Sequence, residues 1–455
     1  MNISTIKDVL KKRKQVLALI LAIIVMLSIV LGYLPGTYMF SNNKVTKDPA
    51  DESTATHNAN ILLASSKEKF LNRDFQGALD DINKAIDLKD DIAELYLLRG
   101  SIFANTKKYD LSIQDYTHAL TLTPALTDIY EIRGHLYNEK KDYVNALTDY
   151  DKVLQYNPSN GEVLLARVNI FINQEQYEYA LKDVNTLLEL EPENSTFYSL
   201  AGDVYSAMGY YDKAVDYYSS TLEHLSDPAD RKNVYLAIGS CSFNMEQYEN
   251  AVEYYSKYLE STSNNEEEVD KGKACFNRGV SYIQLSKYEE AVNDLTLAIE
   301  LAYQPELSAF QRGLAYYMME RYEEAISDLE NYTSTYPENS DPWIYLALSF
   351  YNIEDYDSAI TYFEKCINAN IMLGESNYYL ATICLNRQQF KKAVEHYTAS
   401  ADLDYQTDYS IYNRGVAYLN LNKKEQAKKD FQQVVKITKN TTLKKHAKDA
   451  ISKLS

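Results

Sequence analysis

A 34-residue period dominates this chain of 455 residues. Apolar or small residues recur at positions 4, 7, 8 and 11 of each period, and again at positions 17, 20, 24 and 27. Each set has the spacing of one face of an α-helix, and a short turn separates the two sets. The sequence therefore predicts antiparallel helix pairs that follow one another along the chain. Eleven such repeats begin at residues 59, 93, 127, 161, 195, 232, 272, 306, 340, 374 and 408.

The residue types at these positions are specific. The third repeat carries Tyr130, Gly134, Tyr137, Tyr143, Ala146, Tyr150 and Pro158, and the ninth carries Trp343, Ala347, Phe350, Tyr356, Ala359 and Phe363. Alanine occupies position 20 in ten of the eleven repeats, with Ser112 as the exception. This pattern resembles the tetratricopeptide repeat family over residues 59–441. The resemblance implies an all-α fold, a right-handed α-solenoid whose concave groove binds a protein or peptide partner.

The segment after the last repeat, residues 442–455, is also amphipathic. Leu443, Ala447, Ile451 and Leu454 share one helical face. We predict a capping helix, because a solenoid must cover the apolar edge of its last repeat. This end of the chain is basic, since residues 421–455 hold ten lysines against three acidic residues.

The N-terminus carries a long apolar run at residues 16–34, interrupted only by Ser28 and Gly32. As a helix it would span about 28 Å, close to the thickness of a bilayer core. Basic residues within segment 1–15 precede it, which favours a cytoplasmic N-terminus. We predict a single-pass protein of a bacterial plasma membrane, with the repeats outside the cytoplasm. A cleaved signal peptide is the alternative, although its apolar core is usually shorter.

Residues 35–58 are rich in polar residues and have no apolar period. They are predicted to form a flexible linker between the membrane helix and the repeats.

Composition excludes several functions. The net charge of -19 is concentrated between the two basic ends, and such a surface repels nucleic acid. The four cysteines lack the C-x-x-C spacing of metal or redox sites, and the six histidines form no H-E-x-x-H pair. No phosphate loop or nucleophile elbow is found. The sequence therefore predicts no catalytic residues, no cofactor and no metal.

Arginine at position 7 occurs only in repeats that have aspartate at position 23. The pairs are Arg99 with Asp115, Arg133 with Asp149, Arg167 with Asp183, Arg278 with Asp294, Arg312 with Asp328, and Arg414 with Asp430. We interpret them as structural ion pairs between the two helices of one repeat, although shared descent of these repeats would also keep the residues together. The glycine that often follows this arginine, at position 8, is predicted to face the alanine at position 20.

Positions 2, 5, 9, 12 and 13 are expected to line the groove. In the early repeats they are acidic, and include Glu94, Asp128, Glu131, His135, Glu139, Glu162 and Asp203. In repeats seven to eleven the same positions and the adjacent position 6 are apolar or aromatic. The candidate partner-binding residues are Phe276, Phe310, Leu314, Tyr317, Tyr345, Leu348, Tyr351, Tyr378, Tyr379 and Tyr412. These side chains could anchor a peptide, stack on sugars, or pack against neighbouring helices.

The resulting hypothesis is a membrane-tethered, non-enzymatic scaffold that holds a protein or peptide partner. One alternative is a surface protein that binds an envelope glycan or polymer through the late tyrosines and the basic C-terminal end. Another is a protein similar to organelle import receptors, which also place an anchor before such repeats. That alternative is weakened because no repeat has the lysine at position 5 that a carboxylate clamp of this family uses.

Overall fold

The computed structural model describes residues 49–225, 227, 230–262 and 268–454, and all regular secondary structure in these ranges is α-helical. The predicted membrane helix at residues 16–34 lies outside the described residues, as do residues 1–15 and 35–48. Within the described ranges, every helix is too short or too polar to cross a bilayer.

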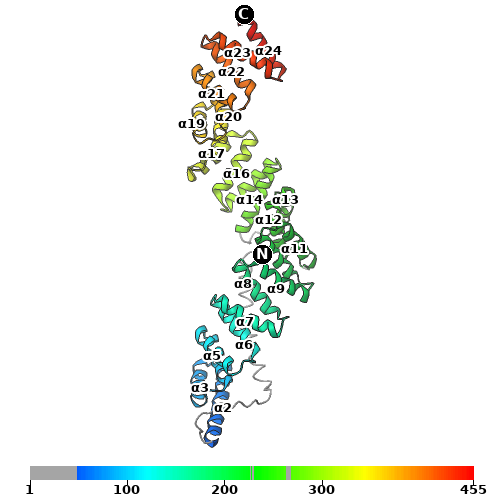
Figure 1. The fold of residues 1–455 in the computed structure, drawn as a ribbon, viewed down its shortest axis with the longest axis vertical. Helices are drawn as coiled ribbons and strands as arrows, with labels where there is room; N and C mark the ends of the chain where they lie inside the picture. The colour runs from blue at the N-terminus through cyan, green and yellow to red at the C-terminus, as the bar shows by residue number, and fades with distance from the viewer. Residues whose placement is uncertain (1–48, 226, 228–229, 263–267, 455) are drawn as a thin grey trace. The chain divides into compact units, whose positions relative to one another are not determined.

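The chain divides into two compact lobes, residues 1–234 and residues 235–455 (Figure 1). The N-terminal lobe contains α2 (Pro49–Leu71), α3 (Phe75–Leu88), α4 (Ala93–Asn105), α5 (Tyr109–Leu122), α6 (Thr127–Glu139), α7 (Tyr143–Tyr156), α8 (Gly161–Asn173), α9 (Tyr177–Leu190), α10 (Ser195–Ala207) and α11 (Tyr211–His224). The boundary between the lobes falls within α12 (Arg231–Asn244). The C-terminal lobe continues with α13 (Tyr248–Ser261), α14 (Glu268–Gln284), α15 (Tyr288–Glu300), α16 (Pro305–Met318), α17 (Tyr322–Thr335), α18 (Trp343–Asn352), α19 (Tyr356–Asn368), α20 (Leu373–Asn386), α21 (Phe390–Asp402), α22 (Thr407–Asn420), α23 (Lys424–Ile437) and α24 (Thr441–Leu454).

Within each lobe, consecutive helices pack as antiparallel hairpins, and each hairpin packs on the next (Figure 1). Each helix pair corresponds to one 34-residue repeat, from α2 and α3 in repeat 1 to α22 and α23 in repeat 11. Six residues separate repeats 6 and 7 in the sequence, and the last four of them, 268–271, lengthen the first helix of repeat 7, because α14 begins at Glu268 and has 17 residues.

The linker prediction is wrong for residues 49–58, because α2 begins at Pro49 and continues without a break to Leu71. Proline suits the first position of a helix, and Asp51 and Glu52 in the first turn are favoured by the helix dipole. Glu52 also accepts a hydrogen bond of 2.9 Å from Lys89, which ties this extension to the end of α3. A favourable first turn and the contact between Glu52 and Lys89 therefore support a helix in a segment that has no apolar period.

A left-handed residue reverses the chain after the first helix of every repeat. Position 15 has a positive φ in all eleven repeats, near +60° at ten non-glycine residues and 78° at Gly209. In repeat 2, Lys107 N donates to Ala104 O at 3.0 Å and Lys108 N donates to Phe103 O at 2.8 Å. These bonds satisfy the last carbonyls of the helix in the manner of a Schellman motif.

The glycine at position 8 makes room for the side chain at position 24. A Cβ atom on Gly134 would lie 2.8 Å from the ring of Tyr150, and one on Gly202 would lie 2.6 Å from the ring of Tyr218. The predicted contact with position 20 is also present, because Ser112 Oγ donates to Gly100 O at 2.7 Å. The atoms that would collide first with a Cβ nevertheless come from position 24, which the sequence did not indicate.

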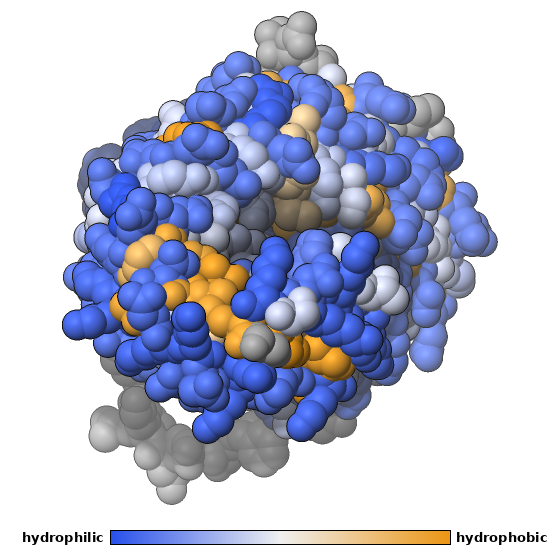
Figure 2. Space-filling view, turned by 90° about the horizontal axis from the view of Figure 1, so that it is seen from above, coloured by the Kyte–Doolittle hydropathy of each residue, from blue (hydrophilic) through white to orange (hydrophobic). Residues whose placement is uncertain are grey.

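The chain ends with the predicted amphipathic helix, α24. Leu443 and Ala447 are buried against α23 in one apolar cluster with Phe431. Figure 2 looks onto this end of the C-terminal lobe and shows a largely hydrophilic surface with several small apolar areas and one larger apolar strip. The burial of Leu443 and Ala447 is what the capping role requires.

Candidate functional site

All six predicted ion pairs form within single repeats. In five of them the guanidinium binds the carboxylate through two hydrogen bonds, as in Arg278 Nε to Asp294 Oδ2 and Arg278 Nη2 to Asp294 Oδ1, both 2.7 Å. The carboxylates are buried, and 6% of Asp294 is exposed. Such bidentate, mostly buried pairs hold the two helices of a repeat in a fixed orientation. Burial raises the pKa of Asp294, and its bonds to Arg278 partly oppose this shift.

A further bond of each arginine, to the preceding repeat, was not foreseen from the sequence. The free Nη1 group donates to a polar side chain at position 25 of the preceding repeat. The acceptors are Asn83 for Arg99, Thr117 for Arg133, Asp151 for Arg167, Ser256 for Arg278, Thr296 for Arg312 and Thr398 for Arg414. Each arginine therefore joins its own hairpin to the previous one, and the pairs form part of the scaffold.

Two repeats depart from this geometry. In repeat 1, which has Ser65 at position 7, Asp81 is held by Ser65 and by Lys69 instead of an arginine. In repeat 4, Arg167 Nε lies 3.0 Å from Asp183 Oδ2, but its N–H does not point at the oxygen, and both atoms lack a hydrogen-bond partner. Burial raises the pKa of Asp183 to about 6, since Arg167 compensates this carboxylate less well.

The predicted groove residues of repeats 8 to 10 come together in one aromatic face of the C-terminal lobe. We call it the tyrosine ladder. It consists of Tyr317 on α16, Tyr345 and Tyr351 on α18, and Tyr378 and Tyr379 on α20. Neighbouring rings meet edge to face, with centroids 5.4 Å apart for Tyr317 and Tyr345, 4.9 Å for Tyr351 and Tyr379, and 5.4 Å for Tyr378 and Tyr379. All five rings are half-buried.

The other five candidate partner-binding residues do not belong to the tyrosine ladder. Leu314 is half-buried beside the ladder, whereas Phe310 and Leu348 are buried in the same apolar cluster. Phe276 packs on Tyr303, and Tyr412 packs on Phe431, in clusters separate from the ladder. Phe310 and Leu348 thus serve as core residues, which was one of the alternatives for this set. The prediction that the remaining residues contact a partner stays a prediction.

The ladder presents neutral phenol groups. Burial raises the pKa of Tyr317 to about 12, and it also raises the pKa of Tyr351, Tyr378 and Tyr379. These hydroxyls keep their protons at neutral pH and can donate or accept hydrogen bonds, but they are poor nucleophiles. Such a face offers apolar ring surface edged with hydroxyl groups.

The four cysteines, Cys241, Cys275, Cys366 and Cys384, are free thiols buried in the C-terminal lobe. Burial raises the pKa of Cys275 and Cys366 to about 11. Thiols of this kind are packing residues rather than nucleophiles.

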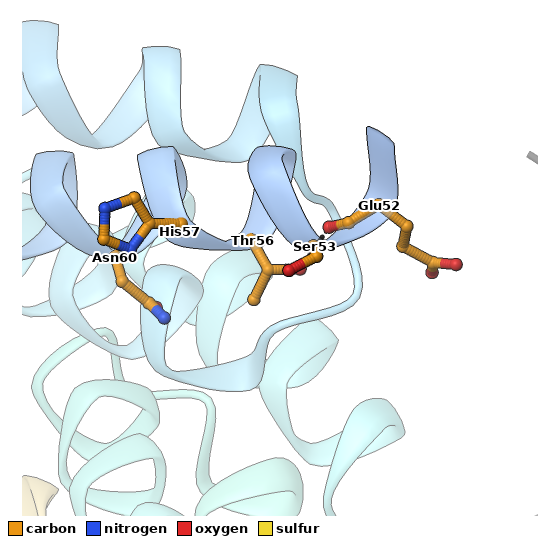
Figure 3. Close-up of a pocket in the computed structure, with 5 residues that line it drawn as sticks. All are labelled: Glu52, Ser53, Thr56, His57 and Asn60. Atoms are coloured by element: carbon orange, nitrogen blue, oxygen red, sulfur yellow. Dashed lines mark hydrogen bonds between the residues drawn. The ribbon is translucent and has the colours of Figure 1, made fainter. Parts of the chain in front are cut away.

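A hollow on α2 is lined by Glu52, Ser53, Thr56, His57 and Asn60 (Figure 3). All five residues belong to one helix, and Thr56 Oγ1 bonds back to Glu52 O at 2.9 Å. Among the residues that the structure describes, α2 alone lines it, so it is a surface depression rather than a built site.

Comparison with known proteins agrees with the hairpin geometry. Family models described as tetratricopeptide repeat match residues 93–126, 127–160, 198–232, 233–265, 272–305, 310–370 and 409–441. These segments together cover more than half of the chain. The search of curated proteins found no significant match.

Solved structures with a similar fold include three at low sequence identity. A tetratricopeptide repeat protein from Parabacteroides merdae ATCC 43184 is 20% identical, with 57% of this chain and 99% of that chain covered and a TM-score of 0.37. YrrB, described as a TPR protein with an unusual peptide-binding site, is 21% identical, with coverages of 42% and 93% and a TM-score of 0.36. MamA is 22% identical, with coverages of 38% and 90% and a TM-score of 0.34.

Stacked antiparallel hairpins with this 34-residue period define an α-solenoid. The chain belongs to the tetratricopeptide repeat family. Members of this class are typically protein-interaction scaffolds rather than enzymes.

Proposed function

We propose that this protein is a membrane-tethered, non-enzymatic scaffold that holds a protein or peptide partner on the tyrosine ladder. The observation that carries the proposal is the gathering of five half-buried tyrosines from three successive hairpins on one face. Tyrosine gives a large contact area with few rotatable bonds and is enriched among residues that dominate binding energy. The ladder therefore suits an apolar or aromatic peptide segment.

A peptide is favoured over a glycan because of how the rings are oriented. The planes of Tyr378 and Tyr379 are 86° apart, and those of Tyr351 and Tyr379 are 66° apart. Each ring face is therefore partly covered by the edge of a neighbour, which leaves little flat surface for a sugar. Apolar peptide side chains can use the remaining edges and hydroxyl groups.

Tethering rests on residues 16–34 and on the basic residues before them. A partner captured by the ladder would be held close to the bilayer, where a linker raises its effective concentration near other membrane proteins.

The proposal is tested by capturing partners from crosslinked cells with the full chain. Replacing Tyr317, Tyr351 and Tyr378 together with Ala should reduce recovery of the main crosslinked partner by about tenfold or more, given the usual energy of anchor residues. A matched control replaces Tyr143, Tyr177 and Tyr211 with Ala. These tyrosines lie at position 17 of repeats 3 to 5 and are also half-buried, but they belong to the N-terminal lobe and do not contact the ladder.

The control triple variant should lose similar stability in a denaturant melt and keep its partner. Equal recovery by the wild type and the ladder variant would contradict the proposal. Loss of the partner only after Glu94, Glu131 and Glu162 are replaced with Gln would place binding on the acidic early repeats instead.

A further inference from the structure

Three potential metal ligands converge in the N-terminal lobe. Glu131 and His135 lie one turn apart on α6, and Glu162 lies in the first turn of α8. One ligand atom from each residue lies within 4.8 Å of the other two. They occupy positions 5 and 9 of repeat 3 and position 2 of repeat 4, which are positions expected to line the groove. Sequence motifs predict no metal here, because the three residues come from two different repeats.

The histidine provides a second observation that points to a ligand. Its Nε2 atom is buried and has no hydrogen-bond partner among the described residues. Glu131 Oε1 lies 3.9 Å from this nitrogen, which is too far for a hydrogen bond. An orphaned imidazole nitrogen costs free energy unless something fills the space beside it.

The groups around the site hold two of the ligands in place. His135 Nδ1 lies 2.8 Å from the Tyr150 hydroxyl, and Asn160 Nδ2 donates to Glu131 Oε2 at 2.8 Å. When Nδ1 donates its proton to the tyrosine oxygen, Nε2 presents a lone pair. The bond to Asn160 occupies one oxygen of Glu131 and leaves Oε1 toward the histidine. Outer contacts of this kind orient metal ligands in known sites.

Charge also favours a cation at this place. Within the described residues, neither Glu131 nor Glu162 pairs with a lysine or arginine. Asp128 adds a further negative charge on the first turn of α6.

We propose that Glu131, His135 and Glu162 form a site for one divalent transition-metal ion of the Zn²⁺ type. One imidazole with two carboxylates suits Zn²⁺ better than Ca²⁺ or Mg²⁺, which prefer oxygen ligands alone. Ligand atoms around tetrahedral zinc are about 3.3 Å apart, given bonds of about 2.0 Å. The carboxylates therefore need to move inward by only about 1 Å. A fourth position stays open for water or for a side chain of a partner.

The test uses the full chain in detergent, freed of metal with a chelator. Co²⁺ titration followed by absorption, and Zn²⁺ competition against a chromophoric chelator, should both show one ion per chain. Glu162 is exposed, so Glu162→Gln should fold normally and weaken Zn²⁺ binding by about tenfold or more. His135→Gln should remove the absorption of bound Co²⁺. Tyr150→Phe should weaken Zn²⁺ binding by about tenfold with one ion still bound.

Two matched variants serve as controls. Glu94 has the same repeat position as Glu162, and His446 is an exposed histidine on α24. Glu94→Gln and His446→Gln should leave the Zn²⁺ affinity unchanged. Absence of binding by the wild type would overturn the proposal, and so would equal affinities of the wild type and Glu162→Gln. An equal loss in Glu94→Gln would also overturn it, because general acidity would then explain the binding. Metal binding is measured without any partner, so this result is independent of the tyrosine ladder.

Discussion

At the scale of single residues, the link between arginine at position 7 and aspartate at position 23 reflects direct contact. We expect Arg278→Leu alone to lower the free energy of unfolding by about 3 kcal/mol, because it leaves Asp294 buried and unpaired. Asp294→Tyr alone should cost a similar amount. The double variant recreates Leu346 and Tyr362 of repeat 9, where Tyr362 stacks on Phe350 at 5.8 Å, and should recover much of the loss.

Denaturant melts of these four proteins form a double-mutant cycle. The coupling energy should be about 1 to 3 kcal/mol. Strictly additive losses would mean that shared descent, and not the contact, keeps the two residues together.

Two aspartates at the same repeat position should respond to pH in opposite directions. The pKa of Asp183 is raised from 3.8 to about 6, mainly by burial. The folded protein then holds this proton more tightly, so the stability that Asp183 contributes is greatest below pH 4 and is lost as the pH rises through 6. Relative to Asp183→Asn, the wild type should lose up to about 3 kcal/mol between pH 4 and 7.

Asp81 is the internal control. Its pKa is lowered, chiefly by the hydrogen bond from Lys69. The stability that Asp81 contributes is therefore present above pH 4 and is lost as the pH falls. Urea melts of the wild type, Asp183→Asn and Asp81→Asn at several pH values should give slopes of opposite sign. Slopes of the same sign would show that Arg167 neutralises Asp183 as fully as Lys69 neutralises Asp81.

Sequence reasoning located the ion pairs but missed the bond of each arginine to the preceding repeat. The pairs were visible because positions 7 and 23 change together between repeats. Position 25 does not change together with position 7 of the next repeat. It is polar even where the next repeat has leucine at position 7, as Glu330 and Glu364 show. The sequence also gives no sign that His135 and Glu162 lie close together. They belong to two different repeats, and this combination occurs only once in the chain.

At the scale of elements, the turn inside each repeat concentrates backbone strain at one residue. Gly209 has φ 78°, and a Cβ added to it would have no neighbouring atom within 4 Å. Gly209→Ala therefore tests the conformational preference of the backbone without a steric clash. We expect a loss of about 1 kcal/mol in the free energy of unfolding, because a Cβ disfavours the left-handed region. Glu175→Ala, at the same position of the previous repeat, replaces one non-glycine residue with another and should change stability little.

Melts of both variants decide this point. Equal effects of the two substitutions would mean that the turn imposes no cost on side chains at position 15.

The turns also explain why helix ends are hard to predict from this sequence. Lysine, glutamate and asparagine occupy a conformation usually assigned to glycine, and the hydrogen bonds of the turn depend on both helices.

At the scale of the whole molecule, the 34-residue period was enough to predict most of the architecture from the sequence. Because the same pattern occurs eleven times in the sequence, the fold of a repeat that matches it poorly, such as the first, can be predicted from the other repeats. Function depends instead on residues that differ between repeats, and these have no repetition to support them. The same positions carry Phe310, a core residue, and Tyr378, a half-buried ring of the ladder.

We propose that the charge asymmetry around the apolar run at residues 16–34 sets the membrane topology of the chain. Basic residues before the apolar run at 16–34 should keep the N-terminus in the cytoplasm, which places the repeats outside. Protease added to intact cells should therefore digest residues 59–455, while a tag placed before residue 16 stays protected until the membrane is opened. Protection of the repeats in intact cells would reverse the proposed orientation. Release of a soluble chain that begins after residue 36 would instead show a cleaved signal peptide, and the ladder would then act away from the membrane.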